Sequence, residues 1–152
     1  MQVAFRLNGK PVSMDVSPAT TVMDYLRREG LFSVKTGCDH GECGSCSILV
    51  DGRAMNACLM LMHSIAGKEV ETLEGLQDQT VTQQLQSDFI EQGAIQCGYC
   101  TPGMLVALTG LSREQINFDE AAVTDALAGN LCRCTGYKKP VEASLKSLKA
   151  EH

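Results

Sequence analysis

Eight cysteines stand out among the residues of this 152-residue chain that could do chemistry. Four of them, Cys38, Cys43, Cys46 and Cys58, form a C-x4-C-x2-C-x11-C pattern. Thiolates with such short spacing hold a [2Fe-2S] cluster through four cysteine ligands. The pattern therefore predicts a redox centre that carries single electrons.

Glycines separate the first three of these cysteines. Gly37, Gly41 and Gly44 can adopt a positive φ without a Cβ clash. We expect them to let the backbone wrap around a cluster and point its N–H groups at the sulfur atoms. Such N–H donors stabilise the extra negative charge of the reduced cluster and so raise its reduction potential.

The other four cysteines form a second group with a different spacing. Cys97 and Cys100 are separated by two residues, and Cys132 and Cys134 by one. In an extended segment, residues two apart point to the same side of the backbone. We therefore expect the thiolates of Cys132 and Cys134 to bind one iron.

A helix is predicted to begin directly after Cys100. Thr101 is expected to cap it, and Pro102 suits the first helical position, where its missing N–H leaves no hydrogen bond unmade. An anionic cluster at this point would be favoured by the positive end of the helix dipole.

Disulfides and zinc are the alternatives for eight cysteines. A disulfide framework is disfavoured, because residues 1–6 do not begin a signal peptide and a hydrophobic content of 44% supplies a core without cross-links. Zinc stays open for the second group taken alone, since C-x2-C pairs are common in zinc sites. The more specific spacing of the first group favours iron for both.

Composition excludes two classes of partner. A net charge of −5 argues against nucleic acid, and no apolar run approaches the length needed to span a membrane. We expect a cytoplasmic protein.

The pattern of the first half predicts a small sheet around one helix. Residues 8–11 are expected to form a turn between two strands, and the helix is expected to end at Gly30. The predicted strands span residues 2–7, 12–16, 47–50, 53–57 and 69–73. This combination predicts a β-grasp, ferredoxin-like domain at residues 1–76 of an α+β protein.

From residue 81 onward the hydrophobic pattern becomes helical, after residues 76–80 have lost their periodicity. Helices are predicted at residues 81–91, 102–111, 119–127 and 140–149. They predict a four-helix bundle domain at residues 81–152, with the second group of cysteines in its loops.

Two stretches around the second group resemble a known family. Gln96–Gly103 and Gly129–Tyr137 are similar to the signature sequences of the small iron-sulfur subunit of molybdenum hydroxylases, the family of xanthine dehydrogenase and aldehyde oxidoreductase. The resemblance extends from Phe5 to Tyr137 and implies two [2Fe-2S] clusters. A plant-type N-terminal domain would carry one of them on the first group of cysteines, and the helical domain would carry the other on the second group.

The resemblance also implies partners and a direction for the electrons. A large subunit would hold the molybdopterin dinucleotide, in its cytosine form if the host is bacterial, and a medium subunit would hold FAD. Gln96 matches the glutamine that hydrogen-bonds the pterin, and Cys134 matches the ligand whose sulfur approaches the pterin amino group. Electrons would then pass singly from the molybdenum centre through the two clusters to FAD or to an external acceptor, with no substrate site on this chain.

A free-standing electron carrier with two clusters is the alternative function. Such a carrier needs only one cluster domain and is expected to be a monomer. The helical domain, with Gln96 beside Cys97, favours a fixed partner.

Overall fold

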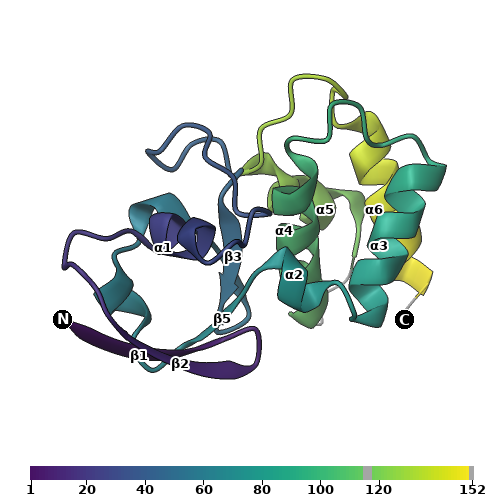
Figure 1. Ribbon diagram of the computed structural model, residues 1–152. Helices are drawn as coiled ribbons and strands as arrows, with labels where there is room; N and C mark the ends of the chain where they lie inside the picture. Colours follow the sequence, from purple (N-terminus) through teal and green to yellow (C-terminus); the bar gives the residue numbers. More distant parts are fainter. Residues whose placement is uncertain (115–117, 151–152) are drawn as a thin grey trace.

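The computed structural model describes residues 1–114 and 118–150 as a mixed α+β protein. Residues 151–152 of the predicted second domain lie outside the described part. Figure 1 shows a sheet on one side and a group of helices on the other. The strands are β1 Gln2–Leu7, β2 Lys10–Asp15, β3 Ser47–Val50, β4 Arg53–Asn56 and β5 Glu69–Glu71. The α-helices are α1 Val22–Arg28, α2 Leu73–Leu76, α3 Thr80–Glu91, α4 Thr101–Arg113, α5 Glu120–Ala128 and α6 Lys138–Ala150, and short 3-10 helices span η1 Ala57–Leu59 and η2 Met62–Ile65.

The five strands form one sheet in the order β2-β1-β5-β3-β4. β1 pairs with β5 in parallel, and the other neighbours are antiparallel. Two tight hairpins build most of this sheet, and their turns fall at Asn8-Gly9 and Asp51-Gly52. All four turn residues have a positive φ, between 49° and 81°, as the two-residue turns of twisted hairpins require. The paired strands are confirmed, but the turn predicted at residues 8–11 is shorter, because Lys10 and Pro11 already pair with Leu7 and Arg6.

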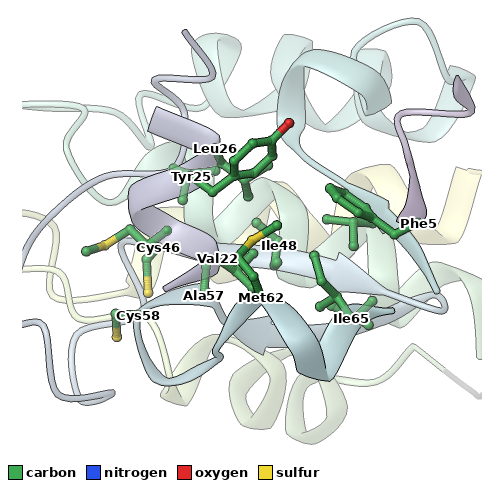
Figure 2. Packing of buried hydrophobic residues seen from close by; sticks show 14 of the residues in the cluster. Phe5, Val22, Tyr25, Leu26, Cys46, Ile48, Ala57, Cys58, Met62 and Ile65 are labelled. Carbon is green, nitrogen blue, oxygen red and sulfur yellow. The ribbon is translucent and has the colours of Figure 1, made fainter. Parts of the chain in front are cut away.

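Helix α1 packs on the sheet and forms the core of the first half. The Thr21 hydroxyl accepts a hydrogen bond from the Asp24 N–H at 3.0 Å and caps the helix. Gly30, with a φ of +84°, follows its end as predicted. The buried side chains of α1 meet residues from β1, β3 and the 3-10 helices, and Cys46 and Cys58 lie at one end of this cluster (Figure 2).

The helical half has its own core, with one helix in the middle. α4 contacts α2, α3 and α5, and it also contacts β3 and β4 of the sheet. Its residues from Gly103 to Leu111 are therefore all buried. Leu49 of β3, Leu76 of α2 and Val106 of α4 form a small third cluster between the halves. This contact fixes the sheet and the helices relative to each other.

A buried polar network joins α3 to α6. Asp88 of α3 is fully buried, accepts hydrogen bonds from Gln84 at 2.8 Å and Ser147 at 2.7 Å, and is ion-paired with Lys146. Burial alone would raise the pKa of this carboxyl group. The hydrogen bonds from Gln84, Lys146 and Ser147 outweigh burial and hold the pKa below its ordinary value.

The last predicted strand is partly wrong. The strand expected at residues 69–73 ends at Glu71, and Leu73 begins the short helix α2. Asn8 explains the break, because its side chain accepts a hydrogen bond from the Thr72 N–H at 2.9 Å and donates one to the Thr72 hydroxyl at 3.2 Å. That side chain takes up the backbone N–H that a longer strand would use.

None of the helices in the described ranges combines the length and the apolar character that a bilayer-spanning segment needs.

Candidate metal centres

The first group of cysteines comes from one loop and one 3-10 helix. Cys38, Cys43 and Cys46 lie on the segment between α1 and β3, and Cys58 lies in η1. The Cys38 thiol interacts with that of Cys43, and the Cys46 thiol interacts with those of Cys58 and Cys43. Figure 2 shows Cys46 and Cys58 beside each other at the edge of the hydrophobic core. The tertiary fold thus brings the four predicted thiols together.

Backbone N–H groups of the loop point at sulfur, as predicted. The Cys38 sulfur accepts hydrogen bonds from the N–H groups of Glu42 and Cys43, each at 3.3 Å. The Ser45 N–H donates to the Cys43 sulfur at 3.5 Å. These contacts favour negative charge on sulfur, whether that of a free thiolate or of a ligand.

The loop glycines have two different roles. Gly41 and Gly44 have φ values of +84° and +69°, as predicted. Gly37 does not have a positive φ, so that part of the prediction is wrong. Residue 37 instead has no room for a side chain, because a Cβ on Gly37 would lie 2.6 Å from the Cys43 sulfur. The backbone therefore approaches the thiol group as closely as only glycine permits.

The thiols of the first group differ in acidity. The pKa of Cys38 is lowered to about 6, chiefly by a hydrogen bond from the His40 backbone and next by one from Cys43. Burial raises the pKa of Cys46 to about 12. Binding of a metal would have to release the Cys46 proton, since only the thiolate is a ligand.

The second group comes from two loops at one end of the helical half (Figure 1). Cys97 and Cys100 lie between α3 and α4, and Cys132 and Cys134 lie between α5 and α6. The thiols pair across the loops, Cys97 with Cys134 and Cys100 with Cys132. That Cys132 and Cys134 bind one iron stays a prediction, but the extended backbone on which it rests is not observed. The segment between α5 and α6 bends instead of running extended, so that the two side chains meet different partners.

Cys100 occupies the N-cap position of α4, one residue before the predicted cap. Thr101 is already helical, and its side chain makes no capping hydrogen bond, so the prediction for Thr101 is wrong. Pro102 lies in the first turn, as expected. A thiolate at residue 100 would face the positive end of the helix dipole.

Three residues that the sequence analysis did not single out support the Cys132 loop. The Tyr137 hydroxyl accepts a hydrogen bond from the Cys132 N–H at 2.9 Å and donates one to the Asn130 carbonyl at 3.0 Å. The Thr135 hydroxyl lies 3.0 Å from the Cys132 sulfur. Thr135 and Tyr137 belong to the stretch Gly129–Tyr137, which resembles a signature sequence of the family. That resemblance could have identified both residues from the sequence.

Acidity also differs within the second group. A hydrogen bond from the Tyr99 backbone lowers the pKa of Cys97, and contact with Cys134 lowers it further. Burial raises the pKa of Cys100 to about 12. Cys97 and Cys134 are exposed, as is the neighbouring Gln96. The outer thiols of this group therefore lie on the surface of the chain.

Direct hydrogen bonds connect the two groups. The Leu131 N–H, next to Cys132, donates to the Cys43 carbonyl at 2.9 Å. The buried Asn130 side chain donates to the Gly44 carbonyl at 2.9 Å and to the Ser47 hydroxyl at 3.1 Å. A Cβ on Gly44 would lie 2.1 Å from the Gly129 carbonyl oxygen. Only glycine at residue 44 permits this approach of the two loops.

The donor set fits two [2Fe-2S] clusters. Each group offers four thiols, and a [2Fe-2S] core takes four cysteine thiolates shared between its two irons. Within the described ranges, no three His, Cys, Asp or Glu side chains are grouped as the ligands of a single metal ion would be. All eight cysteines are free of disulfides.

Two cluster-binding domain families match the chain. A 2Fe-2S iron-sulfur cluster binding domain matches residues 5–72, and a [2Fe-2S] binding domain matches residues 72–145. The chain is 43% identical over 143 residues to the xanthine dehydrogenase iron-sulfur-binding subunit of Escherichia coli O157:H7, covering 91% of this chain and 89% of that subunit.

Two further similarities point the same way. The chain is 41% identical over 138 residues to the nicotinate dehydrogenase small FeS subunit of Eubacterium barkeri, covering 90% of this chain and 88% of that protein. Among solved structures, quinoline 2-oxidoreductase from Pseudomonas putida 86 contains a chain that superposes with a TM-score of 0.87 at 39% identity. That superposition covers 99% of this chain and 94% of the other.

Proposed function

The chain belongs to the iron-sulfur subunits of the molybdenum hydroxylase family, and from that premise we propose how its residues carry electrons between partner subunits. Its function is electron transfer within a molybdenum-dependent oxidoreductase. Cys38, Cys43, Cys46 and Cys58 are the proposed ligands of one [2Fe-2S] cluster, and Cys97, Cys100, Cys132 and Cys134 are those of the other. The single observation that carries this proposal is the convergence of the thiols into two groups of four.

The matched domains support a finer description of the fold. The sheet with its parallel β1 and β5 and the packed helix α1 suits a β-grasp domain of the plant type. Helices α3 to α6 suit a four-helix bundle that holds a cluster between its loops. The proposed domains are residues 1–76 and 81–152.

A bound [2Fe-2S] cluster accepts and releases one electron at a time. The chain's own residues set the conditions for this step. The N–H groups of Glu42 and Cys43 stabilise negative charge at the first centre, and the positive end of α4 does so at the second. The hydrogen bond from the Leu131 N–H to the Cys43 carbonyl joins the two ligand loops directly. It offers electrons a short path through bonds between the two centres.

The exposure of the second group supports its place nearer the molybdenum centre. Gln96, Cys97 and Cys134 are all exposed in the part of the chain that the structure describes. The proposed partner at this surface is a large subunit whose molybdopterin dinucleotide, in the cytosine form, contacts Gln96 and Cys134. The proposed acceptor for the first group is FAD on a medium subunit, or an external molecule.

A cytoplasmic location is proposed because the eight cysteines are assigned as cluster ligands and not as disulfides, which suits a reducing compartment. The proposed assembly of several subunits would form there.

Native purification tests the assembly. A complex that contains this chain, a molybdopterin-binding subunit and iron in a ratio of four atoms per chain supports the proposal, since two diiron clusters need that number. A monomer that retains full electron-transfer activity would instead identify a free-standing carrier. Zinc in place of iron and acid-labile sulfide would exclude the redox function altogether.

Substitution of Gln96 tests the proposed contact with the pterin. In the assembled complex, Gln96→Ala should leave both clusters intact and slow reoxidation of the molybdenum centre by about threefold to tenfold, as loss of one hydrogen bond predicts. Gln92→Ala, at the end of α3, is a control on the same loop. Identical kinetics for both variants would exclude a useful contact of Gln96.

A further inference from the structure

Lys35 belongs to the first cysteine loop, but its side chain reaches the second. Its backbone N–H donates to the Ser45 carbonyl at 3.0 Å, which holds it in the loop three residues before Cys38. Its ammonium nitrogen lies 4.7 Å from the centroid of the Tyr99 ring. Tyr99 stands between Cys97 and Cys100, so the charge of Lys35 lies against the second group.

The Tyr99 ring is fixed from the same loop. Its hydroxyl donates a hydrogen bond to the carbonyl of Thr36, the neighbour of Lys35. Tyr99 is 46% exposed, so it is not buried in a core. The hydrogen bond to Thr36 and the contact with Lys35 hold its ring in place. The ring therefore serves as a platform for the ammonium group, in a cation–π contact.

The charge of Lys35 is not neutralised by a carboxylate. In the part of the chain that the structure describes, the lysine ion pairs involve Lys68, Lys139 and Lys146, and Lys35 takes part in none. The cation–π contact holds this charge against the loop that carries Cys97 and Cys100, although the backbone of Lys35 belongs to the first cysteine loop.

We propose that Lys35, held over the ring of Tyr99, is a positioning residue by which the first domain raises the reduction potential of the second cluster relative to the first. This inference rests on the proposed function, because it requires a cluster at each group of thiols. The physical reason is that reduction adds one negative charge, which a nearby positive charge stabilises. Because Lys35 is only partly buried, solvent screens part of the effect.

The consequence concerns the direction of electron flow. A higher potential makes the second cluster a better acceptor for electrons from the molybdenum side and a weaker donor to the first cluster. Because the charge comes from the first domain, this balance exists only when the two domains are docked as the structure shows.

A redox titration of the complex, followed by electron paramagnetic resonance, tests the proposal. Lys35→Met should lower the equilibrium constant for moving an electron from the first cluster to the second by about threefold to tenfold, the size expected of one partly screened charge. Lys35→Arg should stay within about twofold of the natural protein, since it keeps the charge. Lys10→Met removes the same charge from the β1–β2 hairpin, far from both groups (Figure 1), and controls for net charge.

Tyr99→Leu provides an independent variant that keeps Lys35. Without the ring, the ammonium group is no longer held, and the equilibrium constant should fall in the same direction by a smaller factor. Equal shifts of both clusters in Lys35→Met, a larger shift of the first cluster, or no shift in either variant would overturn the proposal. Absence of one of the two paramagnetic centres from the natural protein would overturn the proposed function instead, so the two failures are distinguishable.

Discussion

The two groups of thiols differ in their relation to a hydrophobic core. Cys46 and Cys58 of the first group are only 3% and 8% exposed and belong to the core under α1 (Figure 2). In the second group no cysteine is buried to this extent, and Cys97 and Cys134 are exposed. The first group thus has two of its four thiols in the interior of a domain, and the second group, at the end of a helical unit, has none.

This difference in burial decides which thiols a partner can reach. The buried Cys46 and Cys58 cannot meet a partner, whereas Cys38 and Cys43 of the same group are only partly buried. The second group keeps its outer thiols at the surface, where a partner cofactor could come into contact with them. The same four-cysteine chemistry therefore serves two positions in one electron path.

The largest expected effect comes from the buried ligand. Cys46→Ser should abolish the first cluster and lower the free energy of unfolding by about 3 kcal/mol or more, because a hydroxyl replaces a thiol in the core and the metal no longer stabilises the domain. Paramagnetic resonance of the reduced protein and denaturant unfolding followed by circular dichroism would measure both effects. A variant that retains two clusters would contradict the ligand assignment.

The exposed ligand should behave differently. Cys134→Ser should remove the signal of the second cluster, leave that of the first intact, and reduce turnover of the complex by on the order of 100-fold or more. Because residue 134 is outside the core, the loss of unfolding free energy should be smaller than for Cys46→Ser. Two unchanged signals, or an equal loss of stability, would remove the contrast between the centres.

The contact between the two cysteine loops should tolerate no side chain at residue 44. Gly44→Ala should lower the free energy of unfolding by about 2 kcal/mol or more, since the methyl group meets the Gly129 carbonyl and the φ is positive. Gly52→Ala is the matched control, with a φ of +81° and no atom within 4 Å of the added Cβ. Equal losses in urea unfolding would show that backbone strain alone, without the contact between domains, explains the effect.

The smallest effect is expected in the helical core, away from the thiols. Asp88→Asn should lower the free energy of unfolding at neutral pH by about 1–3 kcal/mol, because it breaks the ion pair with Lys146. The pKa of Asp88 is lowered in the folded state, so its stabilisation is complete above the ordinary aspartate pKa and is lost as the pH falls through the folded value.

Unfolding of the natural protein and of Asp88→Asn at a series of acidic pH values would test this direction of the pH dependence. The difference between the two should shrink below a pH of about 4. Glu91→Gln is a suitable control, because Glu91 is an exposed partner of the same lysine. A difference that does not change with pH would show that the carboxylate charge of Asp88 is not the stabilising feature.

Local patterns predicted much of the fold. The two hairpins, α1 with its glycine end and the four longer helices follow from hydrophobic periodicity, turn residues and capping. A contact between distant residues explains one of the errors, because Asn8 ends the strand at Glu71 from more than 60 residues away. Helix α4 begins one residue earlier than predicted, with Cys100 as its N-cap.

The spacing of the cysteines was enough to divide the eight thiols into two groups of four, because short gaps fix which residues share a loop. Which thiols pair within a group, and how the groups face each other, depended on the tertiary structure. Cys97 meets Cys134 because the helices α3 to α6 pack together, and Lys35 meets Tyr99 because α4 packs against β3. Such contacts arise from the packing of whole elements, and no local pattern in the chain records them.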